Sequence, residues 1–147
     1  MIRLSHVGLI VHDLDRAVTD WCDRFRMVVV DRDVVEVEGV RNAFLSTDLA
    51  APDSAHIELI EPLDKDDMSN AIARRLATNG EGLYHAAFLV DDPELEADRL
   101  RSVGVEVIDL APVGDGERSR AVVHPRSANG LLLELIAPLA RTGDPAL

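Results

Sequence analysis

Two histidines and two glutamates occupy matching places along this chain of 147 residues. His6 and His85 each follow a short apolar start and lie 79 residues apart (85 − 6). Glu58 and Glu134 each interrupt an apolar run that ends in Pro-Leu, and they lie 76 residues apart (134 − 58). The chain therefore contains an internal repeat, in which each copy opens on a histidine and closes on a glutamate.

These four residue types are metal ligands. A glutamate in the middle of an apolar strand is costly to bury unless it is paired, hydrogen-bonded or bound to a metal. Two imidazoles and two carboxylates suit Co²⁺, Mn²⁺, Ni²⁺, Fe²⁺ or Zn²⁺, and an octahedral ion keeps two positions for substrate oxygens. Taken singly, each residue has a simpler interpretation as a solvent-facing or hydrogen-bonded side chain. The symmetric set of four favours one divalent-metal site, and its members are His6, Glu58, His85 and Glu134.

The segments between histidine and glutamate are also alike in the two copies. Asp13 or Asp15 can cap a first helix, and Asp92-Pro93 can begin a second helix that Gly104 ends. β-Branched runs follow each helix, at 27–37 and 41–47 in the first copy and at 105–110 and 119–124 in the second. The predicted fold class is α+β, with two βαβββ modules that form a pair of half-barrels around the metal site.

The predicted organisation is a single domain over residues 1–147. Module one covers about 1–63, a linker helix about 64–82, module two about 83–139, and a tail 140–147. In the linker, Met68, Ile72 and Leu76 share one helical face, which Asp66 or Asp67 could cap and Asn79-Gly80 would stop.

Composition limits the class of protein. With 47% hydrophobic residues, 147 residues can bury a core without disulfides. The lone cysteine, Cys22, excludes an intrachain disulfide and a sulfur-rich zinc site, so we expect a small buried hydrophobic residue there. The N-terminus has no signal-peptide pattern, and no apolar run is long enough to cross a bilayer. We therefore expect a cytoplasmic protein that does not enter a membrane.

The formal charge of −12 disfavours a phosphate backbone as a partner, so nucleic acid is not expected. An acyl-CoA substrate is polyanionic as well, and a local patch of arginines would have to hold it. The candidates for that patch are Arg41, Arg74, Arg75, Arg118, Arg120 and Arg126.

The order His, Glu, His, Glu on this repeat resembles the vicinal-oxygen-chelate superfamily of glyoxalases, epimerases and ring-cleaving dioxygenases. The resemblance runs from about residue 4 to residue 138. Within the superfamily the chain is most similar to the methylmalonyl-CoA epimerases. The segments that carry this likeness are Gly39-Val40-Arg41, residues 79–85 (NGEGLYH) and residues 124–135 (HPRSANGLLLEL).

The resemblance implies a cobalt-type divalent ion chelated by both oxygens of a malonyl thioester, which stabilises an enolate when a carboxylate removes the α-proton. Proton return on the opposite face would invert that carbon. Residue by residue, the metal ligands fall on the four residues above, and Glu134 is also a proton-transfer group. The expected substrate-binding residues are Tyr84, Arg120, His124 and Arg126. The resemblance also implies a homodimer.

One departure from the family pattern bears on the reaction. The epimerases have a second catalytic glutamate shortly after the Gly-Val pair, and this chain has Asn42 there. A neutral amide cannot take or return a proton, although it can donate a hydrogen bond to an oxyanion. Tyr84 stands where the family commonly has another histidine, and it is either pocket wall or a phenolic acid.

Three functions therefore remain open. The first is a metal-dependent epimerase or isomerase that acts on a methylmalonyl-CoA-like thioester through an enolate. The second is a related metal enzyme that has lost two-base inversion, such as a lyase, a glyoxalase-like isomerase or a natural-product tailoring enzyme. The third is a non-catalytic small-molecule binding or resistance protein, against which the complete ligand set argues. Ring-cleaving dioxygenase chemistry is disfavoured because Glu58 fills a position that it needs open.

Overall fold

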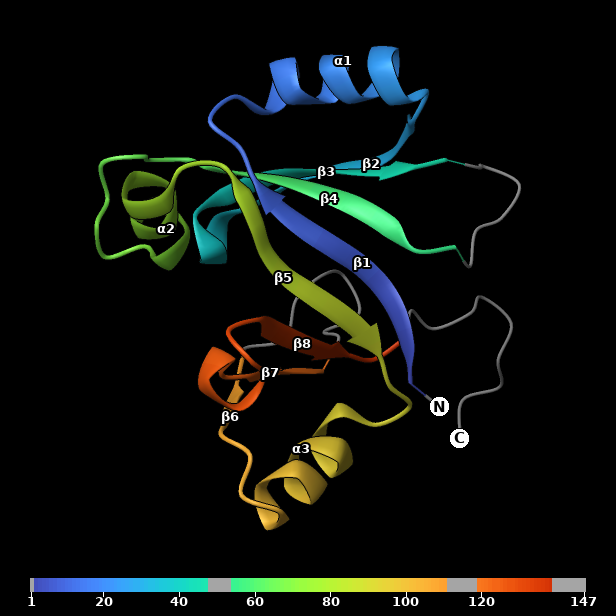
Figure 1. Cartoon of the computed structure of the whole chain (residues 1–147), viewed down its shortest axis with the longest axis vertical. Helices are drawn as coiled ribbons and strands as arrows, with labels where there is room; N and C mark the ends of the chain where they lie inside the picture. The colour runs from blue at the N-terminus through green and yellow to red at the C-terminus, as the bar shows by residue number, and fades with distance from the viewer. Residues whose placement is uncertain (1, 48–53, 111–118, 139–147) are drawn as a thin grey trace. The chain divides into compact units, whose positions relative to one another are not determined.

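The computed structural model describes residues 2–47, 54–110 and 119–138. Contacts divide the chain into two compact units, which we call the N-terminal module (His6–Tyr84) and the C-terminal module (Met1–Ser5 with His85–Leu147). Each has the element order strand, helix and three strands, with one further helix at the end of the N-terminal module (Figure 1). The predicted α+β class and the two βαβββ modules are therefore confirmed.

The N-terminal module is a mixed sheet under one helix. Its strands are ordered β2-β3-β4-β1, with β1 parallel to β4 and the other pairs antiparallel. A β-bulge interrupts the pairing of β2 with β3 near Val29. The elements are β1 (Arg3–Ile10), α1 (Leu14–Phe25), β2 (Val28–Val35), the short 3-10 helix η1 (Glu36–Glu38), β3 (Val40–Ser46) and β4 (His56–Pro62).

One face of this sheet forms the core with α1, which lies across it in Figure 1. Leu14 and Val18 of α1 pack with buried strand residues such as Leu45 and Leu59. Asp13 begins the helix, because its side chain accepts the Arg16 N–H at 3.0 Å, which decides between the two predicted caps. Cys22 is half-buried against the same core, as expected for a small hydrophobic side chain.

Successive side chains of a strand alternate between faces, so the opposite face carries a different set of residues. Glu58 of β4 is aligned with Gly8 of β1 on one side and with Phe44 of β3 on the other. His6 lies two residues before Gly8, and Asn42 two residues before Phe44. The face of the sheet away from α1 thus gathers the polar residues that the sequence singled out.

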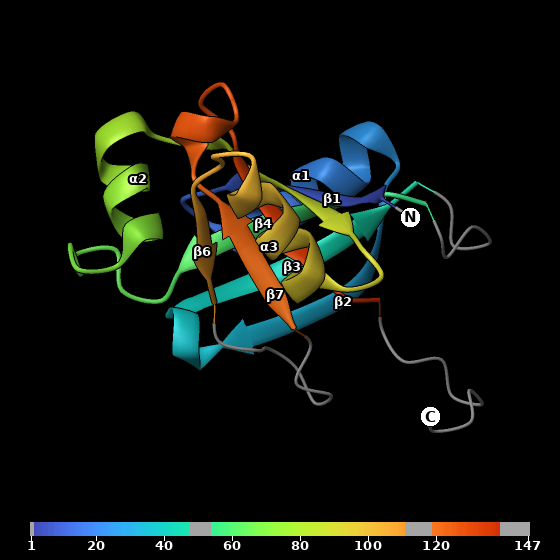
Figure 2. The same cartoon turned by 90° about the horizontal axis from the view of Figure 1, so that it is seen from below.

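The C-terminal module repeats this plan with strand order β5-β8-β7-β6. Its edge strand β6 lies beside β7 in Figure 2. β5 and β8 are parallel, and Glu134 is aligned with Ala87 of β5 and Val122 of β7. Asp92 caps α3 and Pro93 is its first residue, as predicted. The elements are β5 (Gly82–Leu89), α3 (Pro93–Ser102), β6 (Val107–Asp109), β7 (Arg120–Val123), the short 3-10 helix η2 (Pro125–Ser127) and β8 (Leu132–Ile136).

The core of the C-terminal module is smaller. Val90, Val123 and Leu135 form its buried cluster, and partly buried residues such as Leu100 of α3 and Val105 pack against it. A hollow of about 280 Å³, lined mostly by apolar side chains, remains open beside α3 and the outer face of the sheet. The cluster of buried residues under α3 is therefore smaller than the one under α1.

The linker helix α2 covers Ala71–Asn79 and begins later than predicted. Its cap is Asn70, whose side chain accepts the N–H groups of Ile72 and Ala73 at 2.9 and 3.0 Å. The prediction that Asp66 or Asp67 caps it was wrong, because Asp67 instead accepts the N–H and hydroxyl of Ser69 in the turn before. Met68 accordingly lies outside the helix. Along the described stretches of chain, no helix has the length and apolar character needed to span a bilayer.

Candidate functional site

The N-terminal module brings His6 and Glu58 together. Because β1 and β4 are adjacent and parallel, the imidazole reaches diagonally past Gly8, which has no side chain to separate it from the carboxylate. His6 Nε2 lies 3.3 Å from Glu58 Oε2, and both residues are only 7% exposed. Both residues belong to the predicted set of four, and they are neighbours in the fold.

Phe44 and Asn42 of β3 complete the surroundings of this pair. The Phe44 ring meets the His6 ring edge to face, with centroids 5.2 Å apart and planes at 85°. Asn42 Nδ2 donates a hydrogen bond of 2.7 Å to Glu58 Oε1. The other amide atom, Asn42 Oδ1, is buried and has no hydrogen-bond partner among the residues that the structure places. Glu58 therefore has one oxygen beside an imidazole and the other on an amide.

The C-terminal module holds a second pair with the same arrangement. His85 Nε2 lies 3.7 Å from Glu134 Oε2, and the two side chains are 7% and 14% exposed. Ala87, a small residue with no exposed surface, occupies the place opposite Glu134 that Gly8 occupies opposite Glu58. The repeat in the sequence is thus a repeat in geometry.

A buried arginine lies on the far side of Glu134. Arg120 Nη1 is 3.5 Å from Glu134 Oε1, and the arginine side chain is only 8% exposed. A guanidinium remains charged at any ordinary pH, and burying it without a carboxylate partner is strongly unfavourable. Arg120 therefore adds a fixed positive charge beside the second glutamate, where the N-terminal module has a neutral amide.

The two pairs fit the ligands of a divalent ion. Two donor atoms that each lie ~2.1 Å from one ion are separated by about 3 to 3.4 Å. The 3.3 Å separation in the N-terminal module lies in that range, and the 3.7 Å separation in the C-terminal module lies slightly above it. Both are longer than the ~2.7–2.9 Å of a charge-assisted hydrogen bond. Imidazole nitrogen with carboxylate oxygen is also a donor set that first-row divalent metals accept.

The other predicted substrate-binding residues have different surroundings. His124 caps η2, and its Nδ1 accepts the Arg126 N–H at 3.1 Å. The Arg126 side chain is 77% exposed and lies 3.7 Å from Glu106. Tyr84 is half-buried on β5, immediately before His85. Among the four predicted substrate-binding residues, Arg120 is the one with a described contact to a predicted metal ligand, Glu134.

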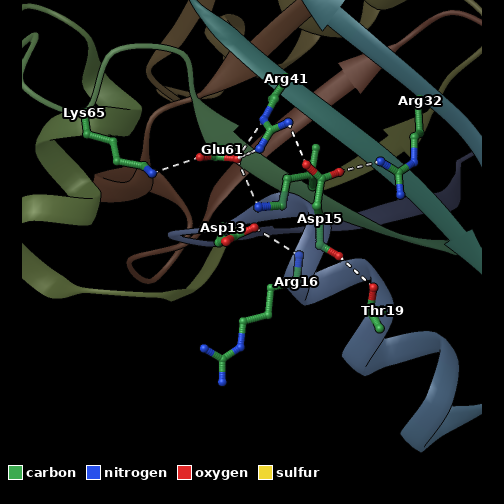
Figure 3. Close-up of polar contacts among 9 residues, drawn as sticks. Asp13, Asp15, Arg16, Thr19, Arg32, Arg41, Glu61 and Lys65 are labelled. Carbon is green, nitrogen blue, oxygen red and sulfur yellow. Dashed lines mark hydrogen bonds and ion pairs between the residues drawn. The ribbon is translucent and has the colours of Figure 1, made fainter.

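Of the remaining arginines considered for an anion patch, Arg41 is already engaged. Its guanidinium pairs with Glu61 and, at 3.1 Å, with Asp15, as Figure 3 shows. Arg74 donates to the carbonyl oxygens of Met68 and Ser69, which fixes the turn before α2. Arg118 lies outside the described residues.

Glu61 anchors α1 to the sheet on the face opposite Glu58. It accepts the Leu14 N–H at the start of α1 at 3.0 Å, and it pairs with Arg41 and with Lys65 at 2.9 Å (Figure 3). Burial raises the pKa of Glu61, but the hydrogen bond from Leu14 and the two cations outweigh burial, so the pKa lies below its ordinary value. Hydrogen bonds from Arg32 and Arg41 lower the pKa of Asp15 in the same network.

The sequence analysis missed the partners of the two glutamates. Asn42 is aligned with Ile60 across β3 and β4, and Arg120 is aligned with Ile136 across β7 and β8. The two residues therefore occupy the same position of the repeat. They lie 78 residues apart (120 − 42), between the offsets of the histidines and the glutamates, so a full self-alignment could have paired them.

Known proteins share the fold of this chain. The profile of the Glyoxalase/Bleomycin resistance protein/Dioxygenase superfamily matches residues 5–123. The chain belongs to this superfamily.

Within the superfamily, similar proteins include both uncharacterized and characterized members. The uncharacterized protein YqjC of Bacillus subtilis is 31% identical over 139 residues, which cover 94% of each chain. The methylmalonyl-CoA epimerase of Mycobacterium tuberculosis is 34% identical, with a TM-score of 0.82, and the match covers 97% of this chain and 91% of that one. A Streptomyces coelicolor methylmalonyl-CoA epimerase variant, solved with 2-nitronate-propionyl-CoA, is 33% identical with a TM-score of 0.81 and coverage of 94% and 98%. These likenesses support an enzyme related to the epimerases.

Proposed function

We propose that this protein is a divalent-metal-dependent isomerase that removes the proton next to the carbonyl of a methylmalonyl-CoA-like thioester. The observation that carries the proposal is the buried His–Glu pair, which occurs once in each module with the same atoms facing one another. A four-ligand metal site needs both pairs, and burial makes each carboxylate costly unless it is paired, hydrogen-bonded or bound to a metal.

In the proposed reaction His6, Glu58, His85 and Glu134 together hold one ion of the Co²⁺, Mn²⁺, Ni²⁺, Zn²⁺ or Fe²⁺ type. When bound, the ion supplies Lewis-acid stabilisation of the negative charge that develops on the substrate oxygen. Glu134 takes the α-proton, because it is a carboxylate at the position of a family proton-transfer group. The Arg120 guanidinium keeps its positive charge beside Glu134 while the enolate of the substrate carries a negative charge. Tyr84, His124 and Arg126 are proposed to contact the rest of the substrate.

One observation favours a second function on the same fold. Asn42 is buried and donates to Glu58, so the position of the second family base holds an amide. Inversion by two bases needs a proton donor on the other face of the substrate, and an amide cannot fill that role. The second candidate is therefore a metal enzyme that forms the same enolate and uses it differently, as a lyase, a glyoxalase-like isomerase or a natural-product tailoring enzyme. A non-catalytic binding protein is the third, and it would not need the metal.

The test is α-proton exchange in D₂O. Protein loaded with Co²⁺ is incubated with methylmalonyl-CoA, and deuterium at the α-carbon is followed by NMR against a His85→Ala control. Exchange well above the control supports enolate chemistry on this substrate class, and the configuration of the labelled product separates inversion from retention. Bound cobalt without exchange would move the proposal to another carbonyl substrate, and no bound cobalt would favour the binding protein.

A second test addresses Asn42 directly. If the pocket is otherwise that of an epimerase, Asn42→Glu supplies the missing proton-transfer group and, at saturating Co²⁺, should raise the rate of inversion about 10- to 100-fold, since a positioned acid or base contributes ~10²–10⁴-fold. The measurement is the interconversion of the two methylmalonyl-CoA configurations. Unchanged inversion, with deuterium exchange intact, would show that the site serves the second candidate reaction.

The proposed setting is a homodimer in a reducing cytosol. Val29, Val30 and Val34 are exposed on β2, the edge strand of the N-terminal module, and they offer apolar surface to a second copy. Analytical ultracentrifugation checks this proposal, because a monomer at micromolar concentration would contradict it.

A further inference from the structure

Asn42 and Arg120 are chemically unrelated, and yet they occupy one position of the repeat. Asn42 stands two residues before Phe44, which is aligned with Glu58 on the neighbouring strand. Arg120 stands two residues before Val122, which is aligned with Glu134 in the same way. Side chains two residues apart in a strand share a face. Both therefore project from the third strand of their module onto the face that carries the His–Glu pair.

The contacts that they make have the same arrangement, although the first is a hydrogen bond and the second is a longer ion pair. Asn42 Nδ2 reaches Glu58 Oε1 at 2.7 Å, and Arg120 Nη1 reaches Glu134 Oε1 at 3.5 Å. In both modules it is the other oxygen, Oε2, that faces the histidine nitrogen. Each carboxylate is thus oriented between a donor on one side and an imidazole on the other.

Burial argues that these contacts are not incidental. Asn42 and the Arg120 side chain are both less than one-tenth exposed, at 7% and 8%. A buried amide or guanidinium costs folding free energy unless its donors are paired, so a position that only filled space would hold an apolar residue. Two unrelated donor residues at the same buried position point to a shared requirement for a donor.

From these observations we infer that Asn42 and Arg120 are equivalent positioning residues, each of which holds Oε1 of its module's glutamate so that Oε2 is presented to the metal site. The inference rests on the proposed metal-dependent function and deepens it. In this role Asn42 orients Glu58 as a metal ligand. Arg120 orients Glu134, which is both a metal ligand and the proposed base. Ligand-orienting partners of this kind typically contribute 10- to 100-fold to metal affinity.

The test measures Co²⁺ binding by calorimetry and by the visible absorption of the bound ion, neither of which requires turnover. The variants are Asn42→Leu and Arg120→Met, which keep side-chain size and remove the donor. Arg120→Lys restores a donor and a charge. The matched controls are Asn79→Ala, at the exposed end of α2, and Arg99→Ala, in an exposed pair on α3. Circular dichroism checks that each variant is folded.

We expect Asn42→Leu and Arg120→Met each to weaken Co²⁺ binding about 10- to 100-fold and to change the absorption spectrum, since the geometry of an oxygen ligand changes. Arg120→Lys should recover part of both, and the controls should match the unaltered protein. If the two variants bind Co²⁺ as tightly and with the same spectrum as the unaltered protein, while His85→Ala does not bind, the positioning role is wrong and the proposed function stands.

The remaining outcomes also decide. If the unaltered protein binds no Co²⁺, both the proposed function and the positioning role fail together. Should Asn42→Leu or Arg120→Met not fold, Asn42→Ala and Arg120→Ala, which remove the donor without adding a large apolar group, become the deciding pair. Unchanged Co²⁺ affinity and an unchanged spectrum in both would then contradict the inference, because neither alanine can donate to the glutamate oxygen.

Discussion

The two modules are alike on the sheet face that carries the His–Glu pair and differ in the helix layer on the other face. In both, a histidine on the first strand and a glutamate on the last face one another across a small residue, Gly8 or Ala87. On the other face, α1 packs on a larger cluster of buried residues and is anchored by Glu61, whereas α3 packs on a smaller cluster beside an apolar hollow of about 280 Å³. The strands therefore place the His–Glu pairs in the same way in both modules, although the helix layers differ.

The largest expected effect is on the rate of α-proton exchange, and it differs between Glu134 and Glu58. Glu134→Gln removes the proposed base and should lower α-proton exchange by ~10²–10⁴-fold, the usual contribution of a general base. Glu58→Gln keeps an oxygen ligand and removes no base, so we expect weaker metal binding with exchange largely restored at saturating metal. Exchange rates in D₂O at several Co²⁺ concentrations measure both. Full turnover by Glu134→Gln would remove this residue from the mechanism.

The next largest effect is on the free energy of unfolding, and it compares a leucine of α1 with a leucine of α3. Leu14 of α1 is only 2% exposed, and truncating a leucine of this kind to alanine costs about 2–5 kcal/mol. Leu100 of α3 is partly buried beside an existing hollow, so Leu100→Ala should cost less, about 1–2 kcal/mol. Urea unfolding of Leu14→Ala and Leu100→Ala measures the two values. Equal losses would contradict the difference in packing between the modules.

A smaller effect tests the anchor of α1. Glu61→Gln keeps the side-chain shape but removes the charge that pairs with Arg41 and Lys65, and we expect a loss of about 1–2 kcal/mol in the free energy of unfolding. The matched control is Glu96→Gln, whose ion pair with Arg99 is at the surface and should change stability by less than ~0.5 kcal/mol. If both substitutions cost the same, Glu61 does not act as an anchor.

The same anchor predicts a pH dependence. The pKa of Glu61 is lowered in the folded protein, so its ionised form stabilises the fold above the unfolded value near ~4.3. That stabilisation is lost as the pH falls through the lower folded pKa. The difference in unfolding free energy between the unaltered protein and Glu61→Gln should therefore shrink between pH 7 and pH 3. A constant difference would mean that the charge of Glu61 is not responsible.

Spacing and strand periodicity were enough to predict the βαβββ repeat and to select His6, Glu58, His85 and Glu134 as one set. Which histidine lies beside which glutamate follows only from the strand register. Asn42 and Arg120 were not paired in advance, because an amide and a guanidinium differ in type, so that only their 78-residue offset or the strand register marks them as equivalent. The start of α2 was wrong for a related reason. Asp66 and Asp67 were the predicted caps, and Asn70, which was not considered, caps the helix instead. Its amide also donates to the Glu38 carbonyl at 2.7 Å, a contact with a distant segment that the local pattern does not reveal.

Strand β4 carries two buried glutamates on opposite faces, Glu58 toward the imidazole and Glu61 toward α1. A slip of one residue in the pairing of this strand would exchange the faces of all its side chains. Glu58 would then enter the apolar layer around Leu59, and Glu61 would lose Arg41 and the Leu14 N–H in the same movement. One register of β4 therefore satisfies both glutamates, because the pairing that joins Glu61 to α1 also places Glu58 beside His6.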